Sequence, residues 1–243
     1  MKLQALVALV TVEMKKLFRH PVNLFLNLLF PALLTVVFIF TFSDPELGMS
    51  INSVVPGLVV YAVIFLIMTV AQSFSSERNL LRRLNTTPMT STEFIFSQII
   101  SNMVIAMIQV IVVITLASLL GFRPESSFAG ILIAVPLTAI FALSSVGLGL
   151  ITATVSKRPE TGTGLSFLFI LPQMFFGTFI PVSSSTQNIA QFVPSHYLFE
   201  GLQLIFNGSW TSTQLFFDLA VISIVSVLII ALGIILFDRY GNL

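Results

Sequence analysis

Residues 54–74 read VVPGLVVYAVIFLIMTVAQSF, an apolar stretch without a single charged side chain. A helix needs about 20 such residues, each rising about 1.5 Å, to cross the hydrocarbon of a bilayer. Arg78, Arg82 and Arg83 follow shortly after the stretch ends. The pattern therefore predicts a transmembrane helix with a basic flank at its carboxyl end.

Five other segments are long and apolar enough to cross a bilayer. Together with the first stretch they predict six transmembrane helices, at about 22–42, 54–74, 95–119, 128–154, 164–181 and 214–237. The composition agrees, because the chain is 56% hydrophobic and 9% charged, whereas a soluble domain is about 25% charged. We expect an all-α membrane protein with a single transmembrane domain over residues 1–243.

Lys and Arg predict the orientation of these helices. If six spans place both chain ends on one side, that side carries ten of the basic residues and the other side carries only Arg123. The ten are Lys2, Lys15, Lys16, Arg19, Arg78, Arg82, Arg83, Lys157, Arg158 and Arg239. Because basic loops stay in the cytoplasm, we expect a multi-pass protein of the plasma (cytoplasmic) membrane with both termini in the cytoplasm.

This assignment leaves no charged residue in the middle of a span. A charge at the bilayer centre costs at least about 2.5–3.5 kcal/mol and commonly marks a proton or ion path. The closest cases are His196 and Glu200, in the apolar segment after the fifth span, and Asp218, at the edge of the sixth. The pattern counts against a proton-coupled carrier, a voltage sensor and an ion pump.

Residues 2–20 carry apolar side chains at spacings of three and four residues, with basic side chains on the other face. The spacing predicts an amphipathic helix, which we expect to lie in the cytoplasmic membrane interface in contact with lipid. The alternative is a plain cytosolic start to the first span.

The longest predicted cytoplasmic loop covers residues 73–94. Its first half can continue the second span as a basic helix, and Pro88 disfavours helix immediately before it. Thr90 or Ser91 can then cap a new short helix with Glu93 in its first turn. The alternative is an ordinary anchoring loop whose arginines only set the topology.

The segment 182–213 is predicted to lie outside, yet residues 189–206 are largely apolar. It is too short to cross and is interrupted by Pro194 and Gly201. We expect a pair of re-entrant short helices that dip into the outer leaflet, where they form a candidate gate. A surface-lying amphipathic segment is the alternative.

Polar residues in the third span share one helical face, because Gln98, Asn102 and Gln109 are separated by four and seven residues. Buried amides of this kind either join neighbouring helices or line a substrate route. In the fourth span, the small residues Gly147 and Gly149 favour close helix packing.

The sequence lacks the motifs for several kinds of binding and catalysis. The sequence has no phosphate loop, no cysteine and two histidines, so we expect no metal site, no catalytic residue and no cofactor bound by this chain. No basic cluster with interleaved aromatics indicates nucleic acid. His196 and Glu200, four residues apart on one helical face, come nearest to a catalytic pair.

The order of these parts resembles the permease subunits of ATP-binding-cassette (ABC) type-2 transporters, a group that includes drug, lipid and polysaccharide exporters. The likeness is carried by SSERNLLRRLNTTPMTSTEF at 75–94, by FFGTFIP at 175–181 and by VPSHYLFEGL at 193–202. It implies a permease domain that moves a hydrophobic or amphipathic substrate outward and is not itself an enzyme. A stand-alone intramembrane enzyme and a passive channel are the alternatives.

The resemblance also implies partners and residue roles. A separate nucleotide-binding ATPase subunit would hold ATP and Mg, and a second permease copy or a paralogue would complete the pathway. Contact with the ATPase is expected from Glu77, Arg78, Arg82, Arg83, Thr87, Pro88, Met89 and Glu93. The expected substrate path is bordered by Asn27, Asn102, Gln109, Phe175 and Phe176. The expected outer gate contains Pro181, Pro194, His196 and Glu200.

Overall fold

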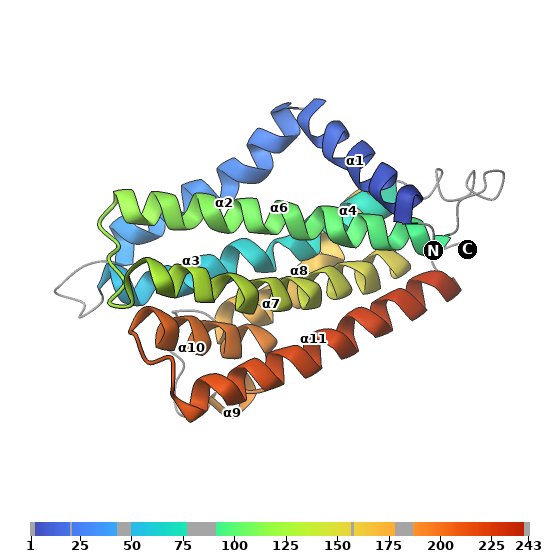
Figure 1. Cartoon of the computed structure of the whole chain (residues 1–243). Coiled ribbons are helices and arrows are strands. Elements are labelled where there is room, and N and C mark those ends of the chain that lie inside the picture. Colours follow the sequence, from blue (N-terminus) through green and yellow to red (C-terminus); the bar gives the residue numbers. More distant parts are fainter. Residues whose placement is uncertain are drawn as a thin grey trace.

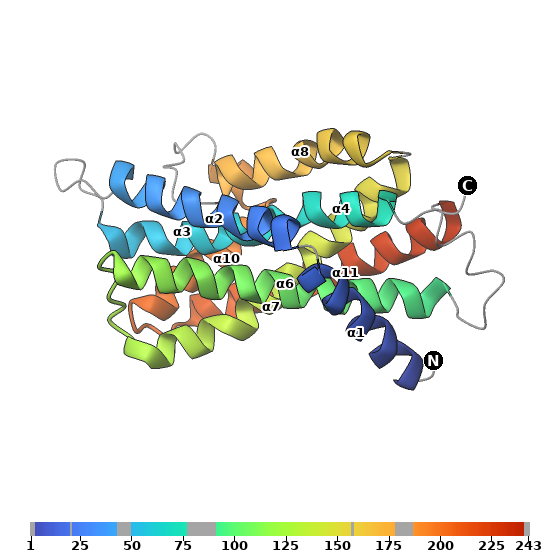
Figure 2. The same cartoon turned by 90° about the horizontal axis from the view of Figure 1, so that it is seen from above.

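The computed structural model describes residues 3–19, 21–42, 50–76, 91–156, 158–177 and 187–240, and every regular element within them is a helix. The long helices run side by side in an elongated bundle (Figure 1; Figure 2). The helices are α1 (Leu3–Arg19), α2 (Pro21–Phe42), α3 (Ile51–Ile64), α4 (Leu66–Ser76), α6 (Ser91–Leu119), α7 (Ser127–Val155), α8 (Pro159–Phe176), α9 (Gln187–Ala190), α10 (Pro194–Phe206) and α11 (Thr213–Tyr240). The all-α prediction is confirmed.

Within the described residues, four helices are long and apolar enough to cross a membrane. They are Ile51–Ser76, Glu93–Leu119, Ser127–Val155 and Thr213–Phe237, and they correspond to the predicted second, third, fourth and sixth spans. The helices α2 and α8 occupy most of the predicted first and fifth spans. The chain is therefore a multi-pass membrane protein, and the count of six spans stays a prediction.

The third span begins differently from the expectation. The sequence predicts a short helix from Thr90 or Ser91 ahead of a span at 95–119, but α6 is one helix of 29 residues with Glu93 in its first turn. No Pro or Gly interrupts residues 91–119, so nothing ends the helix between the two parts. The separate short helix is wrong, because its residues form the first turns of the span.

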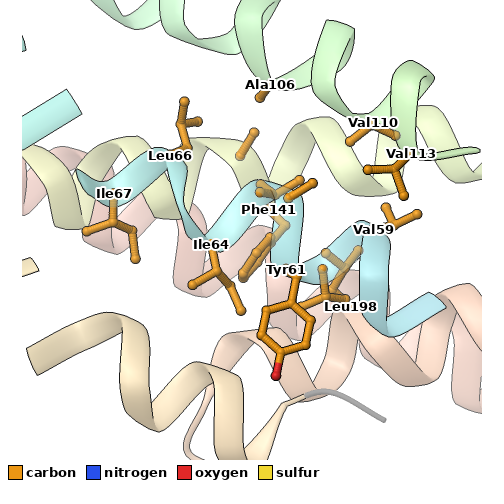
Figure 3. Close-up of a cluster of buried hydrophobic side chains, with 14 of the residues drawn as sticks. Val59, Tyr61, Ile64, Leu66, Ile67, Ala106, Val110, Val113, Phe141 and Leu198 are labelled. Atoms are coloured by element: carbon orange, nitrogen blue, oxygen red, sulfur yellow. The ribbon is translucent and has the colours of Figure 1, made fainter. Parts of the chain in front are cut away.

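The helices α3 and α4 lie at the centre of the bundle. They form the span Ile51–Ser76, in which 83% of the most apolar 18-residue stretch is buried within the chain. In the span formed by α11, the corresponding fraction is 17%. Figure 3 shows their side chains packed against α6, α7 and α10, with Tyr61, Leu66, Val110, Phe141 and Leu198 among the contributors. In a bilayer such close packing, rather than exclusion of water, holds helices together.

Small residues let α7 approach both α4 and α11. A Cβ placed on Gly149 would lie 2.6 Å from the Val70 Cβ and 2.9 Å from the Ile67 carbonyl oxygen of α4. A Cβ on Gly147 would lie 2.8 Å from the Ile230 Cα of α11. The prediction that these glycines serve close packing is confirmed.

The two ends of the bundle differ. Figure 1 shows both chain ends and the start of α6 at one end, and the α6–α7 connection at the other. Arg158, at the start of α8, and Arg239, at the end of α11, belong to the first end, whereas Arg123 belongs to the second. This separation agrees with the predicted sidedness of the basic residues. Which end faces the cytoplasm stays a prediction.

The amino-terminal helix α1 is a separate element that meets α2 at a sharp angle and lies beside the first half of α6 (Figure 1). The apolar side chains of α1 differ in exposure, because Val7 and Val12 are exposed while Leu9 and Met14 are half-buried. An exposed apolar face suits a helix at a membrane surface. Its location in the cytoplasmic interface stays a prediction.

Candidate functional site

A polar cavity of about 540 Å³ lies between α10 and α11, toward the end of the bundle opposite the chain termini. The aromatic rings of Tyr197 and Phe217 form part of its wall. Its polar lining comes from Gln191, His196, Glu200, Gln203, Asn207 and Gln214. Polar groups within a membrane protein gather where they meet water, one another or a ligand. The cavity is the strongest candidate site in the described residues.

Two of the expected gate residues meet on the cavity wall. The Nε2 atom of His196 lies 3.4 Å from the Oε1 atom of Glu200, one helical turn along α10. The contact is an ion pair when the imidazole is protonated. Pro194 is at the first turn of α10, where its missing N–H costs nothing. Pro181 lies outside the described residues.

A buried carboxylate supports the cavity from α11. Asp218 is completely buried, and its Oδ1 accepts a 2.9 Å hydrogen bond from the Gln214 Nε2. Its Oδ2 has no hydrogen-bond partner among the described residues. A Cβ placed on Gly201 would lie 4.0 Å from the Asp218 Cβ, so the two helices pack closely there. From the sequence, Asp218 is recognised only as a residue at the edge of a span.

The amino end of α10 is fixed to α8. The buried hydroxyl of Ser195 donates a 3.0 Å hydrogen bond to the carbonyl oxygen of Gln173. Gly177, which follows α8, leaves room for this contact, because a Cβ there would lie 1.8 Å from the Ser195 Oγ. The glycine therefore allows the start of α10 to sit directly against the end of α8.

The carboxyl end of α10 is fixed to the α6–α7 connection. The backbone N–H of Ser126 donates to the carbonyl oxygen of Phe206 at 3.1 Å. The Phe206 ring packs edge-on against Phe122 with centroids 5.2 Å apart. The Trp210 indole N–H caps the same end by donating to the Ile205 carbonyl at 2.9 Å. Both ends of α10 are thus attached to other elements of the bundle.

Tyr197 links the cavity to the turn before α10. Its hydroxyl donates a 2.8 Å hydrogen bond to the carbonyl oxygen of Gln191, and its ring lies 6.3 Å from the Phe217 ring. Burial, and then the negative charges of Asp218 and Glu200, raise the pKa of the Tyr197 phenol above its usual value. The phenol therefore stays protonated, and remains a hydrogen-bond donor, to a higher pH than a free tyrosine does.

The polar face of the third span points into the bundle. Gln98, Asn102 and Gln109 are each at most 3% exposed. The Asn102 Nδ2 donates to the Gln98 carbonyl at 2.8 Å, and the Ser73 hydroxyl of α4 lies 3.4 Å from the Gln98 Oε1. Gln98 of this polar face therefore joins α6 to α4.

The expected substrate-path residues separate into two groups within one chain. Asn102 and Gln109 lie buried on α6, whereas Phe175, which is 54% exposed, and Phe176 lie on α8. Figure 2 shows α6 and α8 on opposite sides of α3 and α4. Asn27 belongs to α2. A single chain therefore does not bring the amides and the phenylalanines to one wall.

Of the residues expected to contact an ATPase, the structure describes only Glu93. It is 5% exposed in the first turn of α6, where the helix dipole favours an acid. The others, Glu77, Arg78, Arg82, Arg83, Thr87, Pro88 and Met89, lie outside the described residues.

An all-α bundle with several helices of bilayer length defines a multi-pass membrane protein. No group of three or more His, Cys, Asp or Glu that could hold a metal occurs in the part of the chain that the structure describes. The family described as ABC-2 type transporter matches residues 4–207, from α1 through α10. The chain belongs to this family and is a permease of an ABC transporter. A search of curated proteins found no match.

Proposed function

We propose that this chain forms the membrane pathway of an exporter driven by ATP hydrolysis on a separate nucleotide-binding subunit. The family match over residues 4–207 carries this proposal. The sequence contains no phosphate loop, so the energy would come from a partner that binds ATP and Mg. The permease itself performs no bond chemistry and binds no cofactor.

The complete pathway is proposed to contain two copies of this chain, or this chain and a paralogue, in the cytoplasmic membrane. Both termini face the cytoplasm, as the ten-to-one distribution of basic residues favours. The exposed Phe175 on α8 supports a path along that face, because its ring is available to a substrate or to the second permease. The aromatic α8 and the polar outer cavity together suit a hydrophobic or amphipathic substrate.

The continuous helix α6 is the proposed transmitter of motion. It runs about 43 Å without interruption from Ser91 to Leu119. It begins after the loop that is expected to meet the ATPase and ends at the connection that is hydrogen-bonded to Phe206. A rigid shift of α6 on ATPase closure would therefore reach α10 and the outer cavity. The resulting change is a population shift between inward-open and outward-open states.

Reconstitution with an ATPase partner tests the proposal. The permease and an ATPase subunit that copurifies with it are placed in proteoliposomes, and outward movement of a fluorescent amphipathic dye is followed with ATP and with a non-hydrolysable analogue. We expect transport only with ATP. Equal dye movement with both nucleotides would support a passive channel and contradict the proposal.

Charge reversal at Arg82 tests the proposed coupling contact. We expect Arg82→Glu to abolish stimulation of the ATPase by the permease, while Arg239→Glu, an exposed cation at the end of α11, leaves stimulation intact. Normal stimulation in both variants would exclude this contact.

A double substitution tests the intramembrane-enzyme alternative. In the exporter, His196→Ala with Glu200→Ala changes the rate of dye release but leaves ATP-dependent transport detectable. If these residues formed a catalytic pair, the double variant would still assemble normally. It would then have no enzymatic activity, whether or not ATP is present.

A further inference from the structure

An apolar groove of about 500 Å³ runs between α6 and α7, separate from the polar cavity. One wall extends from Met107 to Ser118 of α6, and the other from Phe128 to Val135 of α7. At about 1.5 Å per residue the α6 wall is about 16 Å long. This length is close to half of the roughly 30 Å hydrocarbon thickness, which is the depth of one leaflet.

The groove offers apolar contacts and no unsatisfied hydroxyl. Its two hydroxyl groups are satisfied by their own helix, because Thr115 donates to the Ile111 carbonyl at 2.7 Å and Ser118 donates to the Ile114 carbonyl at 2.8 Å. The side chains of Ile111 and Phe128 are more than 60% exposed along it. Such a surface is suited to a flexible hydrocarbon chain rather than to a polar substrate.

A positively charged side chain lies at one end of this groove. Arg123 lies in the α6–α7 connection, and its guanidinium Nη1 donates to the carbonyl oxygens of Ser118 at 2.8 Å and Phe122 at 2.9 Å. Ser118 is itself a groove residue. The arginine is therefore attached to the end of the groove that a lipid headgroup would occupy.

The backbone of Arg123 is also fixed. The Asn52 side chain of α3 donates to the Arg123 carbonyl at 2.9 Å and accepts from the Arg123 N–H at 3.1 Å. Among the described residues, no acceptor pairs with the guanidinium Nε or Nη2. These N–H groups have the geometry that binds phosphate oxygens. The exposed Glu125 nearby balances the charge of the connection, which suits a zwitterionic headgroup.

We propose that the α6–α7 groove binds a phospholipid, with one acyl chain along the groove and the phosphate on Arg123. The site lies on a different face from the α10–α11 cavity and does not depend on which substrate is exported. It makes one lipid a fixed part of the surface beside α6, the helix that connects the two ends of the bundle.

Photolabelling tests the site. The purified permease in nanodiscs is labelled with phosphatidylethanolamine that carries a diazirine in its acyl chain, and separately with a diacylglycerol that carries the same group but lacks phosphate. We expect the phospholipid to label residues 107–118 and 128–135 about tenfold more than the diacylglycerol does, because a charge-assisted pair contributes roughly that factor. Equal labelling by the two lipids would overturn the proposal.

Two variants with matched controls separate the parts of the site. Arg123→Gln is expected to reduce phospholipid labelling about tenfold to the diacylglycerol level, whereas Arg158→Gln at the other end of the bundle leaves it unchanged. Thr115→Trp fills the groove and blocks labelling by both lipids, whereas Ile224→Trp, at an exposed position on α11, does not. Loss of labelling in both tryptophan variants would indicate general surface binding and would contradict a defined groove.

Another occupant would also be detected. The chain has no native cysteine, so Thr115→Cys introduces a single thiol in the groove. Efficient disulfide formation between two copies in membranes would show that protein, and not lipid, covers the groove, and would overturn the proposal. We expect the Thr115→Cys variant to remain monomeric on a gel and its thiol to stay available to thiol reagents.

Discussion

Gly147 of α7 and Gly233 of α11 face each other so closely that a Cβ on Gly233 would lie 2.7 Å from the Gly147 carbonyl oxygen. The reciprocal Cβ on Gly147 would meet the backbone of Ile230 at 2.8 Å. The atoms that would clash belong to two helix backbones, which do not adjust as a side-chain end does. The contact therefore sets the distance between α7 and α11.

We expect Gly147→Ala to destabilise the bundle by about 1–3 kcal/mol, because the added methyl group overpacks a backbone contact. Gly164→Ala is the matched control, since no atom lies within 4 Å of a Cβ there. In a helix interior that change is expected to be neutral or to stabilise by up to about 1 kcal/mol. Thermal unfolding in detergent measures both, and equal stability of the two variants would contradict the close contact.

The pair formed by Gln214 and Asp218 gives a second prediction. Gln214→Leu removes the donor to a buried carboxylate, so we expect a loss of about 1–3 kcal/mol of stability. Adding Asp218→Leu should recover part of that loss, because the unpaired carboxylate is then gone. Gln203→Leu, in the same cavity, is the control. Additive losses in the double variant would show that the two side chains are independent.

The hydrogen bond from Ser195 to Gln173 predicts how firmly α10 is held. Ser195→Ala leaves a buried carbonyl without this donor, so α10 should be destabilised locally by about 1 kcal/mol. Hydrogen exchange of residues 194–206 is expected to accelerate about fivefold. Ser223→Ala removes only a bond within α11 and should leave this exchange unchanged. Unchanged exchange in both variants would mean that the α8 contact does not hold the segment.

The raised pKa of Tyr197 predicts a dependence on alkaline pH. Between the unfolded pKa near 10 and the higher folded value, the folded state binds more protons, so stability falls as pH rises through this range. Tyr197→Phe removes this dependence. Near neutral pH the variant is expected to lose about 1 kcal/mol with the hydrogen bond to Gln191. Unfolding measured from pH 8 to 11 compares the two chains, and parallel curves would contradict the shift.

Much of the architecture follows from local sequence. Apolar stretches of bilayer length predict four of the spans that the structure contains. Pro181 and Pro194 accompany a predicted pair of short outer helices. The structure has those helices as α9 and α10, although α9 is a single turn. The continuation of the expected short helix into the third span as one helix, α6, was not predictable from caps alone, because a capping residue starts a helix without indicating where it ends.

The candidate site was predicted only in part. His196 and Glu200 were expected to share a face because they are four residues apart, and their side chains lie 3.4 Å apart. The roles of Tyr197 and Gln214 in the same cavity, and the hydrogen bond from Gln214 to the buried Asp218, were not predicted. A spacing of four residues links Gln214 to Asp218 within α11 and was available as a signal, but the approach of α11 to α10 was not.

The order and length of apolar stretches, by themselves, determined that this protein is a helical multi-pass membrane protein, because crossing a bilayer depends on consecutive residues. Tertiary structure alone decided which faces meet: Asp218 against α10, Arg123 at the mouth of the α6–α7 groove, and the amides of α6 away from the phenylalanines of α8. Lipid-facing and buried faces of a membrane helix are almost equally apolar, so helix rotation leaves little trace in hydrophobic periodicity. Rotation is set instead by where small residues permit backbones to touch, as Gly147 and Gly233 do.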